Sequence, residues 1–366
     1  MEIAIATGTR ADWGLLLPLA RALREDHGVH VIATYMHLFP DMGHTVDEIR
    51  ADGFDPDTVE TPRQPAEATA AATAGFSRVL RSLRPDCIVI LGDRFEMLGV
   101  ASAALLERVP IVHIAGGTVS EGAFDDSVRN AISCMASLHF PETDMCAARL
   151  RAMGVAENNV VVSGALGVWN AGHTPLLSLG QLEESIGFRL GERFLLGTFH
   201  PATLERLNPR EQMREWLMAV KDTLDSHPEM TALLTYPNSD TDPAPLIEMM
   251  HALERDMPGR VKVVSSLGRV RSLSASRLAA VVSGNSSSGI VEVPSAGTPV
   301  VDTGIRQQGR ERSRAVIHAP LERAAITTAH NLALSPECAA AAAMTPNPYY
   351  RDDTPGIMTR AIRDFF

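Results

Sequence analysis

The chain alternates short apolar runs with longer amphipathic stretches along nearly its whole length. Most of the apolar runs are rich in Val, Ile, Leu or Ala and lead into Gly, Asp, Asn, Thr or His. Such runs are typical of parallel strands that are buried on both faces. They lie at residues 2–8, 30–36, 87–93, 110–117 and 159–165 in the first half, and at 193–199, 230–237, 260–266, 279–285 and 299–304 in the second.

The stretches between these runs are long enough for crossover helices, as at residues 14–25 and 242–257. Strands that alternate with helices predict an α/β fold with two doubly wound, Rossmann-like domains. A polar break at 167–181 is the candidate linker. We therefore expect an N-terminal domain at 1–166, a C-terminal domain at 167–350, and a C-terminal helix at 351–366 that packs back on the first domain. A single large α/β domain is the alternative.

Composition narrows the possible partners. The chain has 366 residues and a formal net charge of −11, without a dense Lys/Arg run, so we expect neither a nucleic-acid nor a membrane partner. Its four cysteines are scattered and form no CxxC pair, which argues against a zinc site and a disulfide framework. The N-terminus does not resemble a signal peptide, and no stretch is long and apolar enough to span a bilayer. These features predict a soluble, cytoplasmic protein.

Ligands of doubly wound sheets bind beyond the carboxyl ends of the strands, so the residues that follow each run are candidates for chemistry. Arg10 could hold a phosphate or carboxylate there, or pair with a local acid. Asp93, with Arg94 beside it, is either a helix N-cap or a catalytic carboxylate. His200 is either a structural histidine or a group that contacts phosphate and moves protons.

The segment 279–313 is the most informative one. A strand leads into Ser286, Ser287 and Ser288, which open a helix whose amides and hydroxyls would suit a diphosphate. Glu292 follows within reach of a ribose diol, and Arg306 and Arg310 could neutralise phosphates. The alternative is a polar helix start with solvent-facing charges. No GxxxxGK[ST] motif occurs and no GxGxxG follows the first strand, so an ATPase or a dinucleotide oxidoreductase is not supported.

Taken together, these segments resemble the hydrolysing UDP-N-acetylglucosamine 2-epimerases of bacterial sialic and legionaminic acid synthesis. The resemblance spans nearly the whole chain, and GNSSSGI with the downstream RQ-GR is its most specific part. The segments that carry it are GTRADWG, MHLFPDMGHT, ILGDRFEML, HIAGGTVSEGAFDDSVRNAIS, GTFHPATLE, TYPNSDTD, SSLGRVRSL, GNSSSGIVEVPS, GIRQQGR and NPYY.

The resemblance implies a two-domain fold like that of GT-B glycosyltransferases, with the nucleotide on the C-terminal domain and the active site in the interdomain cleft. It implies a homo-oligomer, a dimer or tetramer, that uses no nicotinamide cofactor. We expect no other cofactor, and no metal either, because no His/Asp/Glu cluster in the sequence has ligand spacing. The substrate would be a UDP- or GDP-hexosamine. Loss of the C2 proton and of the nucleoside diphosphate would give a 2-acetamidoglucal, and addition of water with reprotonation of C2 on the other face would release a free N-acetylmannosamine-type sugar.

The same resemblance suggests roles for individual residues. Asp93 and Asp125 match acidic residues regarded as catalytic in relatives, and His200 matches a histidine that contacts the diphosphate or assists proton transfer. Arg129 would orient Asp125. The residues assigned to nucleotide or substrate binding are Arg10, Arg94, Asn238, Ser286, Ser287, Ser288, Glu292, Arg306 and Arg310.

One stretch departs from the family pattern. Relatives usually read HIHGGE or HIEGGE where this chain reads HIAGGT, so Ala115 and Thr118 occupy positions of acid/base side chains. Three interpretations remain open. Glu121 or Asp126 supplies the missing carboxylate; the smaller side chains make room for another sugar substituent; or the chain binds a nucleotide sugar and performs altered chemistry. A non-hydrolysing epimerase is a further alternative.

Overall fold

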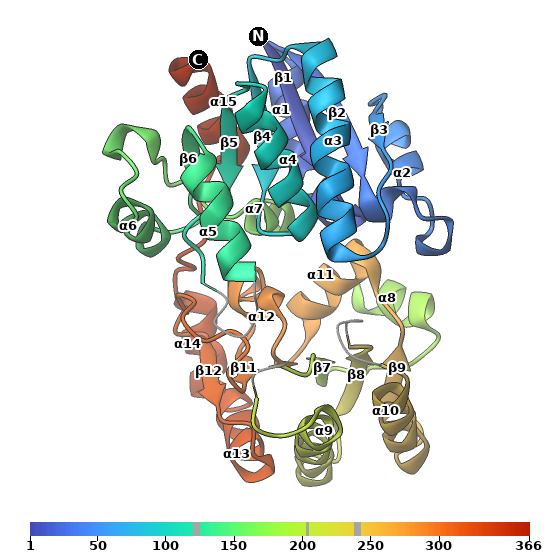
Figure 1. The fold of residues 1–366 in the computed structure, drawn as a ribbon. Helices are drawn as coiled ribbons and strands as arrows, with labels where there is room; N and C mark the ends of the chain where they lie inside the picture. The colour runs from blue at the N-terminus through green and yellow to red at the C-terminus, as the bar shows by residue number, and fades with distance from the viewer. Residues whose placement is uncertain (120–124, 203–204, 238–242) are drawn as a thin grey trace. The chain divides into compact units, whose positions relative to one another are not determined.

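The computed structural model describes residues 1–366 except 120–124, 203–204 and 238–242. The described chain forms two compact units (Figure 1). Unit 1 holds the described residues within 1–118, 124–170 and 351–366, and unit 2 holds those within 119–123 and 171–350. Each unit is built around its own parallel sheet of six strands. The predicted fold class is therefore confirmed.

The sheet of unit 1 has the order β3-β2-β1-β4-β5-β6. All its strands are parallel, as the near-continuous apolar runs predict. Their carboxyl ends therefore meet at one edge of the sheet. The strands are β1 (Glu2–Thr7), β2 (Gly28–Thr34), β3 (Asp57–Val59), β4 (Cys87–Leu91), β5 (Ile111–Ile114) and β6 (Leu138–Phe140).

Helices cover both faces of this sheet, because successive strand residues point to opposite sides. Ile3 and Ile5 contribute to a core with helices α1, α2 and α15, whereas Ala4 and Ala6 contribute to a core with α3, α4 and α5. The helices of unit 1 are α1 (Arg10–Arg24), α2 (Val46–Ala51), α3 (Pro65–Leu83), α4 (Phe95–Leu106), α5 (Asp125–Met135), α6 (Asp144–Ala152), α7 (Leu166–His173), which continues into unit 2, and α15 (Thr354–Phe365), with short 3₁₀ turns η1 (Tyr35–Leu38), η2 (Pro40–Met42) and η3 (Glu157–Asn159).

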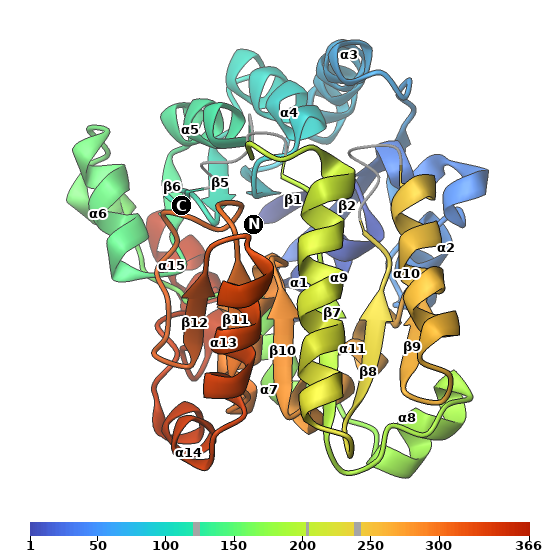
Figure 2. The ribbon, with the colours of Figure 1, turned by 90° about the horizontal axis from the view of Figure 1, so that it is seen from below.

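Unit 2 repeats this plan with the sheet order β12-β11-β10-β7-β8-β9. Helices α9, α10 and α13 cover one face (Figure 2), and α8 and α11 contribute to the core on the other. The strands are β7 (Phe194–Thr198), β8 (Thr231–Thr235), β9 (Val261–Val264), β10 (Val281–Gly284), β11 (Val300–Thr303) and β12 (Val316–Ala319). The helices are α8 (Leu179–Ile186), α9 (Pro209–Ser226), α10 (Ala244–Asp256), α11 (Gly268–Leu278), α12 (Ser287–Val291), α13 (Arg323–Ala333) and α14 (Pro336–Met344), with the turn η4 (Val293–Ala296).

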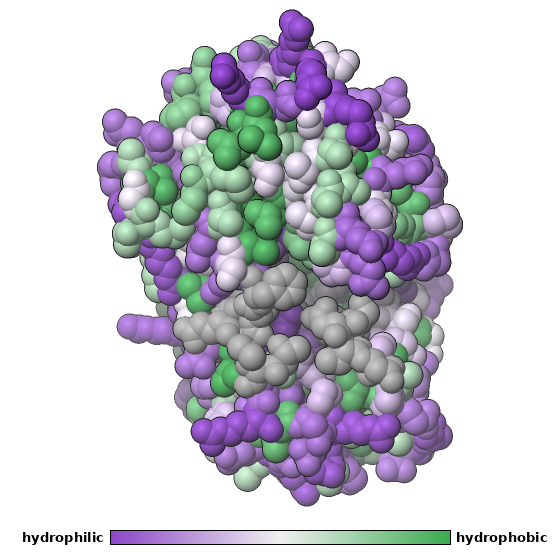
Figure 3. Space-filling model, in the orientation of Figure 1, coloured by the Kyte–Doolittle hydropathy of each residue, from purple (hydrophilic) through white to green (hydrophobic). Residues whose placement is uncertain are grey.

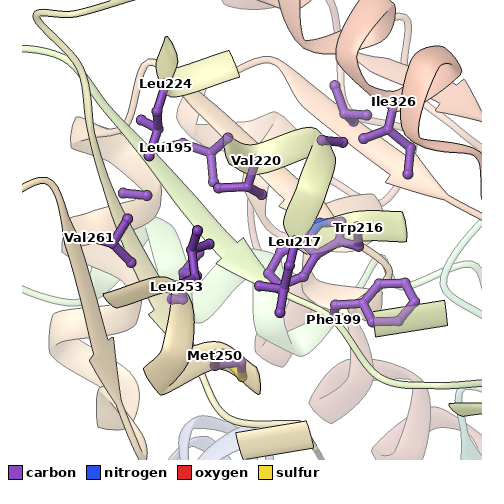
Figure 4. Packing of buried hydrophobic residues seen from close by; sticks show 14 of the residues in the cluster. Leu195, Phe199, Trp216, Leu217, Val220, Leu224, Met250, Leu253, Val261 and Ile326 are labelled. Atoms are coloured by element: carbon purple, nitrogen blue, oxygen red, sulfur yellow. The ribbon is translucent and has the colours of Figure 1, made fainter. Parts of the chain in front are cut away.

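A buried polar chain anchors the larger core of unit 2. Trp216 stacks on Phe199 with ring centroids 5.5 Å apart (Figure 4). Its indole N–H donates to Ser283 Oγ at 3.0 Å, and that oxygen lies 2.7 Å from His330 Nε2. His330 Nδ1 lies 2.8 Å from Thr223 Oγ1, so each polar atom in the chain has a partner. These hydrogen bonds hold Ser283 of β10 in place, and the end of that strand carries the serine-rich segment.

The segment 159–165 does not form the predicted strand. Only Val160 makes a bridge, to His139, and Val161 N donates to His139 O at 2.9 Å. Its neighbour β6 is a three-residue strand at the edge of the sheet, so few backbone groups are available to pair with a further strand. The structure instead forms three short strands that the pattern did not indicate, namely β3, β6 and β12.

Candidate active site

Asp93 lies at the carboxyl edge of the unit 1 sheet, two residues beyond β4, in a loop that continues into α4. Its carboxylate forms an ion pair with the guanidinium of Arg129, a residue of α5 whose side chain is only 3% exposed. The Asp93 side chain is 24% exposed and so can still meet a ligand. Arg129, on the helix that follows the neighbouring strand β5, therefore orients the predicted catalytic carboxylate.

Arg129 makes two further contacts. Its Nη1 donates to Asp126 Oδ1 at 2.6 Å and to the carbonyl oxygen of Thr118 at 2.7 Å. Because a guanidinium presents its donors in a rigid plane, it holds both carboxylates and the end of the 115–118 loop in one arrangement. Asp125 and Asp126 open α5, where the helix dipole stabilises negative charge. We call Asp93, Asp126 and Arg129 the carboxylate cluster.

The HIAGGT loop, which follows β5, passes close to its neighbours. A Cβ on Gly117 would overlap the carbonyl of Cys146, and the φ of Gly117 is +77°, so glycine is required there. Ala115 has a φ of +64°, which is unusual for a residue with a Cβ. Thr118 is 5% exposed, and its hydroxyl donates to Glu142 Oε2 at 3.3 Å. A carboxylate from the loop after β6 thus reaches Thr118, at the position where the resemblance implies an acid.

Arg94 turns toward the opposite side of the same edge. Its Nε donates to Glu96 Oε1 at 2.5 Å and lies 3.9 Å from Asp12 Oδ2. Glu96 is fully buried, and its Oε2 has no hydrogen-bond partner among the described residues. Burial raises the pKa values of the Glu96 and Asp12 carboxyls, while the Arg94 guanidinium opposes the rise. Arg94 is therefore a braced side chain rather than a mobile one.

Two buried histidines stiffen this edge. His113 Nε2 donates to Gly92 O at 2.8 Å while Nδ1 accepts from Ser133 at 3.0 Å, a pattern that requires the neutral ring. His37 lies between Thr7 and Thr45 at 3.0 and 2.9 Å. Burial lowers the pKa of each to about 4. By contrast, the Arg10 side chain at the start of α1 is 55% exposed and forms a 3.8 Å ion pair with Glu48.

His200 lies just beyond β7 in unit 2 and is clamped through its backbone. Its N–H donates to Asn285 Oδ1 at 2.7 Å, and Asn285 Nδ2 returns a bond to its carbonyl at 2.7 Å. Burial and then the charge of Arg306 lower the pKa of His200 to about 4. The ring is therefore neutral at neutral pH and can donate one N–H or accept one proton.

The serine-rich segment follows directly. Gly284 has a φ of +136°, and a Cβ there would overlap the backbone of Thr198, so the chain can turn only with glycine. Ser286 precedes α12, and its side chain makes no capping bond within the described part of the chain. Ser287 and Ser288 form the first turn, and Glu292 ends the helix. The serine-led helix start predicted from the sequence is thus present.

Basic side chains from the loop after β11 approach the same turn. Arg306 Nη1 and Gln307 Nε2 both donate to the carbonyl of Asn285, at 3.2 and 2.9 Å. Arg310 lies partly buried in this loop. Arg312 pairs instead with the buried Asp302 at 2.8 Å. The structure therefore brings His200, the serines and Arg306 together around Asn285.

Two predicted residues, Glu121 and Asn238, lie outside the described residues. Within the part of the chain that is described, no group of His, Cys, Asp and Glu side chains could hold a metal ion, and no helix is long and apolar enough to cross a membrane.

Comparison with known proteins decides the family. The family described as UDP-N-acetylglucosamine 2-epimerase matches residues 21–363. The chain belongs to this family. It is 32% identical over 87% of its length to a GDP/UDP-N,N'-diacetylbacillosamine 2-epimerase (hydrolyzing) of Campylobacter jejuni, of which 84% is covered. It is 33% identical over 91% of its length to the UDP-N,N'-diacetylbacillosamine 2-epimerase (hydrolyzing) of Legionella pneumophila, of which 89% is covered.

Solved structures show the fold of this epimerase family. A putative UDP-N-acetylglucosamine 2-epimerase from Listeria monocytogenes is 19% identical, with a TM-score of 0.83 and coverage of 100% of this chain and 96% of that chain. The UDP-GlcNAc 2-epimerase from Neisseria meningitidis, solved bound to UDP-GlcNAc, is 17% identical, with a TM-score of 0.77 and full coverage of both chains. The predicted GT-B-like fold class, with two Rossmann-like folds, is thereby confirmed.

Sequence reasoning missed several members of the site. Glu96, Glu142, Asn285 and Gln307 were not singled out, although Asn285 closes a predicted strand and could have been found from that position. Glu142 follows β6, a strand too short for the hydrophobic pattern to reveal. The sequence contained no signal that Arg129 would contact Asp93, because 36 residues separate the two.

Proposed function

We propose that this member of the epimerase family is a hydrolysing 2-epimerase. Its substrate would be a UDP- or GDP-activated N-acetylhexosamine, UDP-N-acetylglucosamine or a close analogue, and its products the free 2-epimer and a nucleoside diphosphate. The carboxylate cluster carries the proposal, because it places a partly exposed, oriented carboxylate where the sheet offers its ligand edge. Two relatives above 30% identity are both named hydrolyzing enzymes.

The reaction assigns a task to each group. One carboxylate, Asp93 in our proposal, removes the proton from C2, and the C1–O bond breaks with its electron pair leaving on the diphosphate. Water then adds its hydroxyl to C1 of the glycal, and C2 receives a proton on the opposite face. Asp125, Asp126 or the undescribed Glu121 would serve as the second acid/base. Because Arg129 already holds Asp93 and Asp126 before substrate binds, less free energy is needed to orient them for the reaction.

The nucleotide side would use the groups around Asn285. Arg306, Arg310 and the hydroxyls of Ser286, Ser287 and Ser288 would stabilise charge on the departing diphosphate. Neutral His200 would donate a hydrogen bond or transfer a proton. Glu292 would bind the ribose, while Arg10, Arg94 and Asn238 would contact substrate. We further propose a cytoplasmic enzyme of a sialic- or legionaminic-acid type of pathway, with 1–166 and 167–350 acting as sugar and nucleotide domains.

Turnover in deuterated water tests the function. The released N-acetylmannosamine-type sugar should carry deuterium at C2, detected by mass spectrometry. The variants Asp93→Asn and Asp125→Asn should each lower the rate about 10²- to 10⁴-fold, whereas Asp225→Asn, which breaks an exposed pair with Lys221, should not. Release of nucleotide without C2 deuterium would show a glycosidase. Binding of nucleotide sugars without turnover would show a binding protein, the outcome that Thr118 would favour.

We also propose that the enzyme is a homo-oligomer. Apolar side chains gather on the face of unit 1 that is formed by α3, α4 and α5 (Figure 3). Leu105 and Leu106 at the end of α4 are 51% and 75% exposed, which is large for leucine. Light scattering should report a dimer or tetramer that Leu106→Glu weakens. A monomeric wild-type protein would contradict this.

A further inference from the structure

Tyr35 occupies a backbone conformation that residues with a side chain seldom adopt. Its φ is +51°, in the left-handed region, directly after β2. Outliers of this kind concentrate at ligand sites, where surrounding contacts hold them. The conformation projects an aromatic ring at the carboxyl edge of the unit 1 sheet, the edge that also carries Asp93. The ring is only partly buried.

Two further rings accompany it. The Tyr35 ring lies edge-on to Phe95, with centroids 5.1 Å apart, and edge-on to Phe39, with centroids 5.2 Å apart. All three side chains are partly exposed, so this group is not a sealed core. The Tyr35 hydroxyl donates to the carbonyl of Arg63 at 3.1 Å, which fixes the ring in place.

Arg94 completes the group. Its guanidinium carbon lies 5.5 Å from the centroid of the Tyr35 ring and 5.8 Å from that of Phe95. The buried Glu96 carboxylate pairs with the Arg94 guanidinium, and the Arg94 side chain remains 30% exposed. Adjacent residues thus divide the edge: Asp93 faces Arg129, and Arg94 faces the rings. Both residues follow β4, so a sugar that binds at Asp93 occupies the same sheet edge as Arg94.

We propose that Tyr35, Phe95 and Arg94 form a subsite for an acylamino substituent of the hexose, in addition to the one at C2. This inference rests on the function proposed above and names its substrate class: a nucleotide-activated, diacylated hexosamine. The aromatic rings would contact the acyl methyl group, and the guanidinium would donate to the amide carbonyl. A hydroxyl substituent would gain little from these rings, because it has no apolar surface to bury.

Two relatives above 30% identity are named for a sugar with two N-acetyl groups, which agrees with this chemistry. A relative from Neisseria meningitidis at 29% identity is named for UDP-N-acetylglucosamine, a sugar with one N-acetyl group. In this chain the subsite would favour diacylated over monoacylated substrates within one reaction type.

The test compares UDP-N,N'-diacetylbacillosamine with UDP-N-acetylglucosamine as substrates of wild type, Tyr35→Gly and Tyr35→Phe. Wild type should prefer the diacylated sugar. Tyr35→Gly, which removes the ring and relieves the backbone, should lower kcat/KM for that sugar about tenfold and leave the monoacylated one nearly unchanged. Tyr35→Phe should keep the preference. Arg84→Gly is the matched control, because it relieves a φ of +51° at the end of α3, away from the rings.

The outcomes separate the subsite from the reaction. An equal loss for both sugars in Tyr35→Gly, or an unchanged ratio, would overturn the subsite. If wild type releases free sugar from neither substrate, the proposed reaction is wrong, and calorimetric binding of the same two nucleotide sugars then decides about the subsite. A preference for the diacylated ligand that Tyr35→Gly abolishes would still support it, and equal affinities would refute it.

Discussion

At the scale of single residues, Arg129 shows how one buried cation organises a site. It joins Asp93, Asp126 and the carbonyl of Thr118, which come from three different segments. None of these groups could hold the others alone, since two are anions and the third is an acceptor. The arrangement of the acids therefore depends on a side chain that has no need to touch substrate, and we regard Arg129 as a positioning residue.

The variant Arg129→Lys tests that role. Lysine keeps the positive charge but loses the planar fork, so it cannot hold all three partners in the same geometry. We expect kcat to fall about 10²-fold with little change in KM, because small misplacements of reacting groups are costly. Steady-state kinetics measures this, with Arg151→Lys, whose side chain pairs with Glu157 on the surface, as the control. A rise in KM at constant kcat would instead indicate a binding contact.

At the scale of elements, the functional groups cluster in the loops that follow β4, β5, β7, β10 and β11, as parallel sheets require. The hydrophobic pattern predicted all five of these strands, and hence where the loops begin. It could not predict what the loops do. The sequence does not indicate the positive φ of Tyr35 or of Ala115. Nor does it indicate the hydrogen bond from Thr118 to Glu142 or that from His200 to Asn285, because each joins residues that are distant along the chain.

Ala115 offers a test at this scale. Left-handed φ places a Cβ close to the backbone, at a cost of about 1–2 kcal/mol. Ala115→Gly removes that cost but adds freedom to the unfolded chain, so we expect a net gain of about 1 kcal/mol in the free energy of unfolding. Urea unfolding measures it. Destabilisation would mean that the methyl group packs well enough to outweigh the strain.

At the scale of the whole molecule, two doubly wound parallel sheets were predictable from the alternation of apolar runs and amphipathic segments, but not all six strands of either sheet. The failures have a common cause. The strands β3, β6 and β12 are three or four residues long, with polar residues among them, so no pattern could emerge. The segment 159–165 has the right composition but lies beside the short edge strand β6, where few partners remain. Pairing depends on neighbours, not on composition alone.

Buried histidines in both units should make stability depend on pH. Burial lowers the pKa values of His37, His113, His139 and His200 from 6.5 to about 4, and that of His330 to about 3. Between pH 6.5 and 4 the unfolded chain binds protons that the folded chain refuses, so stability falls as the pH falls. Each such histidine contributes a slope of about 1.4 kcal/mol per pH unit, and the contribution is complete above pH 6.5.

Two carboxyls oppose this trend. The raised pKa values of Asp12 and Glu96 let the folded state keep protons that the unfolded state releases, and this contribution is lost as the pH rises. The histidines outnumber them, so we expect a net loss of stability from pH 7 to pH 5 in denaturant titrations. His330→Gln should flatten the curve by one histidine's share. Equal stability of the wild type at both pH values would contradict the account.

Helix α15 has a consequence for how the protein is made. Met358 and Ile362 belong to the same core as Ile3 and Ile5, so unit 1 is completed only after the residues of unit 2 have been synthesised. At about 5–20 residues per second, roughly 10–40 s separate the synthesis of residue 170 from that of the last helix. During that interval an incomplete first unit leaves apolar surface exposed while the second unit can already fold. Nascent chains of this protein should therefore be most dependent on chaperones shortly before α15 is synthesised.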